Sequence, residues 1–207
     1  MKKSILLVAI VFITTSLFAQ DNSSFFQTKV LGKGISPSPL QLSIDAYPFL
    51  FLANGGGGSI GLEFGNWQVG AIGFSTVPPD YIRNTFFENA DNIQIRRNNA
   101  IELFANYYLR KDRKGIYAGI LGGPEWFMLQ DKISGIRETI VKSYVVPRLG
   151  LRVFPFKKIF YADASFGWSF NMSGNDNLKL GQTTFNPASG GFIYFIQLGA
   201  KFNITKD

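Results

Sequence analysis

The chain has 207 residues with 21 basic and 14 acidic side chains, which gives a net charge of +7. It contains no cysteine and no histidine, so disulfides, a lipid-modified cysteine, and metal sites built on either residue are excluded. The basic excess is mild and scattered over turns and loops, so no nucleic-acid partner is expected. We expect neither a metal nor a cofactor. The abundance of phenylalanine and glycine suits strands better than helices.

The first residues predict a signal peptide over residues 1–19. Two lysines, Lys2 and Lys3, precede an apolar run over residues 5–13, and small residues lead to a cleavage site after Ala19. The apolar run is too short to span a bilayer. Residues 20–39 carry no sustained hydrophobic period, and we interpret them as an extended N-terminal lead-in.

The rest of the chain, residues 40–204, predicts eight antiparallel strands joined by alternating short and long connections. The predicted strands cover residues 40–52, 59–64, 67–76, 99–110, 115–130, 143–156, 159–171 and 191–204. Tight turns are expected at 65–66, 111–114 and 157–158, and longer connections at 77–98, 131–142 and 172–190, with a helical turn around 81–89. This alternation is typical of an up-and-down barrel with short turns at one end and long loops at the other.

The residue pattern within the strands indicates what lies on either side of the sheet. In residues 147–154, Leu149 and Leu151 share one face while Arg148 and Arg152 share the other, because successive side chains point to opposite faces. Glycine and serine separate the charges on the polar faces of the later strands, which favours a crowded interior over a free surface. We therefore predict an all-β fold, an eight-stranded antiparallel up-and-down transmembrane β-barrel, over residues 40–204.

A two-residue turn at Lys157-Lys158 predicts the pairing of the flanking strands. Counting back from that turn places Arg152 opposite Asp163 inside the barrel, where an unpaired charge is costly. We predict that this ion pair belongs to a network of inward-facing charges that fills the barrel and leaves no continuous pore. Its members are Glu102, Glu125, Arg148, Arg152, Asp163 and Lys201.

Two of these carboxylates admit a second interpretation. Glu102 and Glu125 lie on neighbouring predicted strands and on the same face, so an acid and base pair like that of a glycosidase is conceivable. The alternative is that both neutralise arginines and Lys201 within the barrel. We favour neutralisation, because a narrow barrel offers no substrate cleft.

The C-terminal residues resemble the signal by which outer-membrane barrels are recognised for assembly. The pattern consists of a polar residue, a glycine and two apolar residues in the last strand, here Gln197, Gly199, Phe202 and Ile204. With the leader, the strands and the loop alternation, the chain looks like a small outer-membrane β-barrel of the OmpA-like or OmpW-like kind. The resemblance implies export to the cell outer membrane, with outer-membrane lipid and the barrel-assembly machinery as partners.

The same resemblance shapes the functional prediction. Outer-membrane phospholipases, lipid A acyl-modifying enzymes and omptin-like proteases resemble one another in using histidine for proton transfer, and this chain has none. We predict a non-enzymatic protein with a structural or surface-interaction role, whose extracellular or small-molecule ligand the sequence does not identify. Outer-loop residues predicted to pack on the barrel rim or to contact a partner are Tyr81, Ile82, Phe86 and Phe87. Alternatives are an OmpW-like channel for small solutes and a secreted soluble β-sandwich binding protein.

Overall fold

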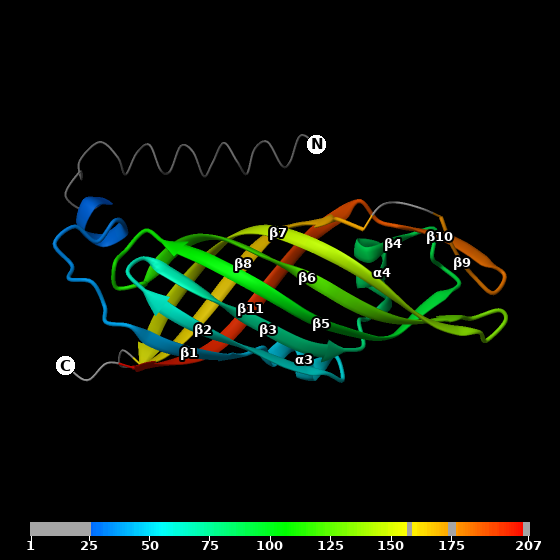
Figure 1. Ribbon diagram of the computed structural model, residues 1–207, viewed down its shortest axis with the longest axis horizontal. Coiled ribbons are helices and arrows are strands. Elements are labelled where there is room, and N and C mark those ends of the chain that lie inside the picture. Colours follow the sequence, from blue (N-terminus) through cyan, green and yellow to red (C-terminus); the bar gives the residue numbers. More distant parts are fainter. Residues whose placement is uncertain (1–25, 157–158, 174–176, 205–207) are drawn as a thin grey trace.

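The computed structural model describes residues 26–156, 159–173 and 177–204. Within these ranges eight strands close into an antiparallel barrel in the order β1-β11-β8-β7-β6-β5-β3-β2 (Figure 1). Each strand pairs with its neighbours along the chain, and β1 pairs with β11 to complete the ring. This is the predicted eight-stranded up-and-down barrel. The alternative prediction of a β-sandwich is therefore wrong. The predicted signal peptide and the Lys157-Lys158 turn lie outside the described residues.

Short elements accompany the barrel strands at both ends of the barrel. In chain order the elements are η1 (Phe26–Val30), β1 (Gln41–Ala46), α3 (Pro48–Leu52), β2 (Gly56–Phe64), β3 (Trp67–Thr76), α4 (Asp80–Phe86), β4 (Phe87–Glu88), β5 (Ile93–Tyr108), β6 (Gly115–Asp131), β7 (Arg137–Phe156), β8 (Phe160–Asn171), β9 (Leu178–Leu180), β10 (Thr183–Pro187) and β11 (Gly190–Asn203).

The strand boundaries differ from the prediction at several places, and β2, predicted from residue 59, begins at Gly56. The first predicted strand, 40–52, stops at Ala46, because Pro48 has no N–H for a sheet ladder and instead begins helix α3. Strands β5 and β7 begin at Ile93 and Arg137, so they extend into segments that we expected to be loops. The expected loop 172–190 contains the β9–β10 hairpin, which pairs with β4 in a small separate sheet.

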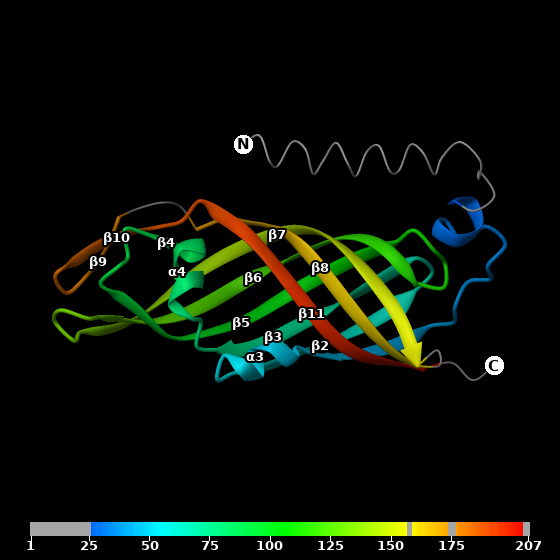
Figure 2. The same ribbon diagram turned by 180° about the vertical axis from the view of Figure 1, so that it is seen from behind.

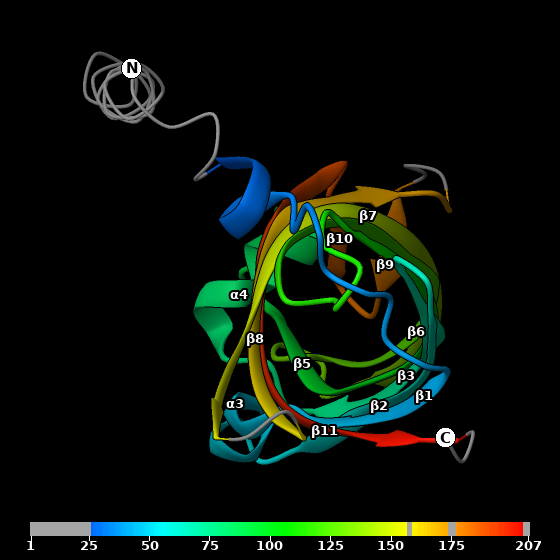
Figure 3. The ribbon, with the colours of Figure 1, turned by 90° about the vertical axis from the view of Figure 1, so that its left-hand side faces the viewer.

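The two ends of the barrel are built differently. The tight turns lie at one end, where residues 31–40 cross in front of the barrel mouth (Figure 3). At the other end α4 and the small sheet of β4, β10 and β9 rise beyond the barrel (Figure 2). We refer to these as the turn end and the loop end.

The barrel wall has the reverse of the side-chain distribution of a water-soluble protein, with apolar residues outside and polar residues inside. Outward positions on every barrel strand carry exposed large apolar side chains, among them Ile60, Leu103 and Leu149. Inward positions bury charged and polar side chains, including Glu63, Arg152 and Asp163. No helix of the described residues is long and apolar enough to cross a bilayer.

Candidate functional site

The strongest group of contacts in the barrel interior is an ionic cluster near the turn end. Glu63 on β2 accepts a hydrogen bond from Arg152 Nη1 on β7 at 2.5 Å and another from Arg113 Nε at 2.9 Å. The side chains of Glu63 and Arg113 are fully buried and that of Arg152 is 1% exposed. One carboxylate therefore compensates two buried guanidinium groups, an arrangement that is costly to disrupt.

Arg113 enters this cluster from the turn between β5 and β6. Its φ of 54° lies in the left-handed region, which folds the turn back under the barrel. Arg113 also donates to the carbonyl oxygens of Gly65 and Pro39 and to the side chain of Gln41, at 2.8, 3.0 and 2.6 Å. It thus joins the β5–β6 turn, the β2–β3 turn and the lead-in across the barrel base.

The predicted register between β7 and β8 is present from Arg148 to Arg152. Arg148 pairs with Gly167, Leu149 with Phe166 and Arg152 with Asp163. Arg152 Nε lies 3.3 Å from Asp163 Oδ2, so these side chains form an ion pair inside the barrel. Nearer the turn the register shifts after Val153 and pairs Phe156 with Phe160 instead of Ile159.

Aromatic rings enclose the Arg152 guanidinium. Its central carbon lies 4.0 Å from the ring centroid of Tyr161 and 4.8 Å from that of Tyr108. The Tyr117 hydroxyl donates to the second oxygen of Asp163 at 2.7 Å. The ion pair is therefore held in place by packing on both partners, which favours a single geometry.

Arg148 lies one layer further into the barrel and is not part of this ion-pair cluster. It donates to Asn106 Oδ1 at 3.1 Å and lies over the rings of Phe104, Tyr117 and Phe195 at 5.7 to 5.9 Å. No carboxylate of the described residues forms an ion pair with it. Contacts with aromatic ring faces therefore take the place of the expected ionic partner.

Glu102 and Glu125 are also inward and buried, but they stand apart from the ion pairs. On β5, Glu102 precedes the apolar residue Phe104, and on β6, Glu125 lies between Leu121 and Phe127. Asn98 Nδ2 donates to Glu125 at 2.6 Å. Within the described part of the chain neither glutamate joins an ion pair. Apolar residues lie on both sides of the two glutamates.

Lys201, the last member of the predicted network, is inward and largely buried near the turn end. Its ammonium nitrogen lies 4.5 Å from the ring centroid of Phe154, and it forms no ion pair with the described residues. The structure therefore pairs Arg152 with Asp163 directly, whereas Glu102, Glu125, Arg148 and Lys201 form no ion pair with the described residues.

Sequence reasoning missed two residues that complete the base of the cluster. Glu63 lies on the inward face of β2, and its alternation with Leu62 and Phe64 was a usable signal. Arg113 carried no such signal, because periodicity says nothing about the direction of a turn side chain. Its place depends on the left-handed backbone of the turn.

An apolar cluster lies at the loop end, inside the barrel extension. Phe86 and Phe87 from the expected outer loop are buried there, and their rings lie 5.1 and 5.2 Å from that of Phe127. Phe87 also meets Phe185 of β10 at 5.6 Å. These two phenylalanines pack against the protein, while the side chains of Tyr81 and Ile82 lie outside the described residues.

Asp131, the last residue of β6, connects the β6–β7 loop to the β9–β10 hairpin. Its carboxylate accepts five hydrogen bonds, from Ile133, from both the amide and the hydroxyl of Ser134, and from Gln182 and Thr183. The bonds from Ser134, Gln182 and Thr183 hold the pKa of Asp131 well below its ordinary value of 3.8, although burial opposes them.

This lowered pKa predicts how the hairpin responds to acid. With the hairpin open, Asp131 titrates near 3.8, so its contribution is complete above that pH and is lost only as the pH falls through the lower value of the closed state. We expect the β9–β10 hairpin to stay closed at pH 4 and to open below it. Hydrogen-exchange mass spectrometry of residues 178–187 over a pH series measures the opening.

Asp131→Asn tests the same contact at neutral pH. The amide cannot accept the full set of bonds, so exchange in the hairpin should rise about tenfold at pH 7 and lose its acid dependence. Glu88→Gln, an exposed carboxylate on the neighbouring strand β4, should leave exchange unchanged. Unaltered protection in Asp131→Asn would show that other contacts hold the hairpin.

The residues of the C-terminal pattern divide between the two faces of the last strand. Gln197 and Gly199 lie on the inward face of β11, and a Cβ on Gly199 would lie 2.2 Å from Asp45 Oδ1. Phe202 and Ile204 are half exposed on the outer face. The amide of Ile204 bonds to the Leu40 carbonyl at 3.0 Å, which extends the β1–β11 seam past the strand end.

No family model and no curated protein matches this sequence. Among solved structures, the chain is similar to the crystal structure of the N-terminal β-barrel domain of Pseudomonas aeruginosa OprF. The two share 15% sequence identity with a TM-score of 0.46, over 79% of this chain and 98% of that chain.

Proposed function

We propose that this chain is an integral β-barrel protein of the bacterial outer membrane, with a non-enzymatic role that is structural or lies in contacts at the outer surface. The single observation that carries the proposal is the reversed distribution of side chains across the barrel wall. Charges such as Glu63 and Arg152 are buried inside, while every barrel strand exposes at least one large apolar side chain on its outer face. Water would penalise so large an apolar exterior, whereas a lipid bilayer would favour it.

Exposed aromatic side chains form two partial rings on the exterior, as expected at the two interfaces of a bilayer. Near the turn end they are Phe64, Trp67, Tyr107, Phe160 and Phe202. Towards the loop end they lie on α3, β8 and β11 and are Phe49, Phe51, Trp168, Phe170 and Phe192. Phe166 and Tyr194 are exposed between the two groups. Such rings place amphipathic or large aromatic groups at headgroup depth.

The distance between these rings suits a hydrocarbon layer. Along β8, Phe160 belongs to the first ring, and Trp168 and Phe170 belong to the second. They are therefore 8 to 10 residues apart, which is close to the roughly 9–11 residues that a tilted strand needs to cross a membrane. Closure of the barrel leaves no unpaired strand edge in lipid.

The contacts in the interior support a structural or surface role over a channel. We propose that the Glu63, Arg113 and Arg152 cluster closes the turn end and that the aromatic cluster around Phe127 closes the loop end. Between them lies a further apolar layer that includes Phe104 and Leu121. We propose outer-membrane lipid as the surrounding partner and the barrel-assembly machinery as the reader of Gln197, Gly199, Phe202 and Ile204.

The proposal predicts where the protein is found and how it migrates. We expect it in the outer-membrane fraction of cells, soluble only in detergent, and with faster gel migration before boiling than after, because a closed barrel resists unfolding by detergent. Cell fractionation and heat-dependent gel migration measure both properties. Recovery in the soluble periplasm without detergent contradicts the membrane assignment. Conductance steps in planar bilayers would contradict the closed interior and favour an OmpW-like channel.

A further inference from the structure

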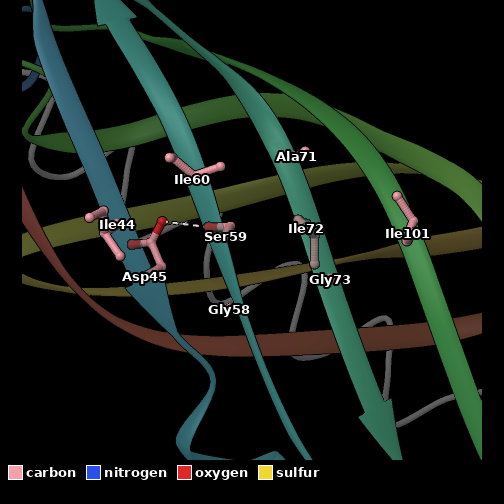
Figure 4. A pocket seen from close by; sticks show the side chains of 9 residues that line it. All are labelled: Ile44, Asp45, Gly58, Ser59, Ile60, Ala71, Ile72, Gly73 and Ile101. Atoms are coloured by element: carbon pink, nitrogen blue, oxygen red, sulfur yellow. Dashed lines mark hydrogen bonds between the residues drawn. The ribbon is translucent and has the colours of Figure 1, made fainter.

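A groove of about 360 Å³ is open on the outer wall of the barrel, across β1, β2, β3 and β5. Its outward lining comprises Ile44, Gly58, Ile60, Ala71, Gly73 and Ile101. Figure 4 shows the isoleucine side chains around the two glycines. Asp45, Ser59 and Ile72, which face the barrel interior, border it from behind. The groove thus offers outward side chains that are entirely apolar.

The groove exists because small residues coincide in neighbouring strands. Ala46 pairs with Gly58, Gly58 with Gly73, and Gly73 with Ile101. A Cβ on Gly73 would meet nothing within 4 Å, so the floor there is open space and not a close backbone contact.

Helix α3 bounds the groove on its loop-end side. Phe51 is 63% exposed, and a Cβ on Gly56 would lie 3.4 Å from its ring. The ring therefore lies over Gly56, the outward residue of β2 next above Gly58. On β3, Ser75 is the next outward residue beyond Gly73 towards the loop end.

Two adjacent arginines, Arg96 and Arg97, lie further towards the loop end on β5. A register shift between Ile95 and Arg97 interrupts the β5–β6 ladder, and both Arg96 and Arg97 are exposed where regular alternation would bury one of them. Arg97 Nη1 donates to the Ser75 hydroxyl at 2.8 Å. Neither arginine forms an ion pair with a carboxylate of the described residues.

These positions fit the interface of the outer leaflet. Asn99, the outward residue between Arg97 and Ile101, pairs with Trp126, and Arg97 pairs with Met128. The arginines lie towards the loop end, above an apolar row and beside α3 with its exposed Phe49 and Phe51. An anionic headgroup at Arg97 and Ser75 would therefore continue directly into a chain lying over Gly73.

We propose that this groove and its two arginines bind one phosphorylated acyl lipid of the outer leaflet, of the lipid A class. The acyl chain occupies the space over Gly58 and Gly73, and the phosphate accepts hydrogen bonds from Arg96, Arg97 and Ser75. The guanidinium fork matches phosphate oxygens in pairs. A phosphomonoester carries up to about two negative charges, so it matches two cations better than a singly charged phosphodiester does. This inference rests on the proposed membrane location.

Two variants separate the groove from the arginines. Gly73→Leu fills the floor without a clash, and Arg96→Gln with Arg97→Gln removes both charges. The experiment titrates bis-phosphorylated lipid A, its dephosphorylated form and phosphatidylglycerol into the folded barrel in detergent, with native mass spectrometry as the readout. We expect one bound lipid A on the wild type and about tenfold weaker binding in each variant. The arginine variant should not change binding of the dephosphorylated lipid.

The matched control is Ala118→Leu, a small-to-large change at an exposed outward position of β6. It should bind lipid A as the wild type does. Undiminished binding by Gly73→Leu, or equal binding of lipid A and phosphatidylglycerol by the wild type, overturns the lipid assignment. Heat-dependent gel migration is recorded for every sample. Absence of the folded form in the wild type would count against the membrane barrel itself and not against the groove.

Discussion

Glu63→Gln should destabilise the barrel more than any other single carboxylate-to-amide change, by about 3–5 kcal/mol in the free energy of unfolding. The change is nearly isosteric, so it leaves packing intact and removes only the charge. Glu63 bonds to both Arg113 and Arg152, whose side chains are 0% and 1% exposed. Two buried guanidinium groups would then share only Asp163 as a charged partner. Urea titration of the folded barrel in lipid vesicles, followed by fluorescence of the three tryptophans, measures the loss.

Glu138→Gln is the matched control for this prediction. Glu138 lies near the start of β7 at the loop end, where it is exposed and forms no ion pair with the described residues. Its substitution should change the free energy of unfolding by less than about 0.5 kcal/mol. A similarly small effect of Glu63→Gln would mean that the cluster at the barrel base is not tightly coupled to folding.

Arg152 and Asp163 should show strong coupling in a double-mutant cycle. Arg152→Met leaves both Glu63 and Asp163 short of a cation, and we expect it to cost about 3–5 kcal/mol. Asp163→Asn should cost about 2–3 kcal/mol. In this variant Arg152 keeps its ion pair with Glu63 but loses the ionic contact that it makes with Asp163 at 3.3 Å. The double variant should fall short of the sum by about 1–3 kcal/mol. Unfolding free energies of the four proteins under one set of conditions give the coupling.

A distant pair provides the reference for additivity. Asp163→Asn combined with Glu138→Gln joins positions at opposite ends of the barrel wall, which share no contact. Their effects should add within about 0.5 kcal/mol. If the effects of Arg152→Met and Asp163→Asn on the free energy of unfolding also simply added, the ion pair between these residues would contribute no stability of its own.

The candidate site could be predicted in part, because strand alternation fixes a face but not a partner. Alternation placed Glu102, Glu125, Arg148, Asp163 and Lys201 inside the barrel, and turn counting paired Arg152 with Asp163. Depth along the barrel decides which inward charges meet. Phe104 and Leu121 form an apolar layer that separates the two glutamates from the base cluster. The offset between strands that sets this depth depends on closure of the whole ring.

The packing at the loop end could not be predicted from the sequence for a related reason. Phe86, Phe87 and Phe185 come from segments without a sustained hydrophobic period, and their positions depend on their packing against one another. Such clusters depend on contacts between distant parts of the chain, which local propensity does not encode. Likewise, the first strand ends before Pro48, which lacks the N–H that a sheet ladder needs. The prediction, which rested on alternation alone, missed this end.

The sequence by itself determined the fold class, the number of barrel strands, the end at which the tight turns lie and the face that residues of the predicted strands occupy. It could do so because a period of two and a turn signal are local properties of the chain. Only the tertiary structure decided that Glu63 joins Arg113 to Arg152, and that Gly58 and Gly73 align in neighbouring strands to form a groove. Those features arise from the register across closed strands and from the backbone of one turn, which no single segment specifies.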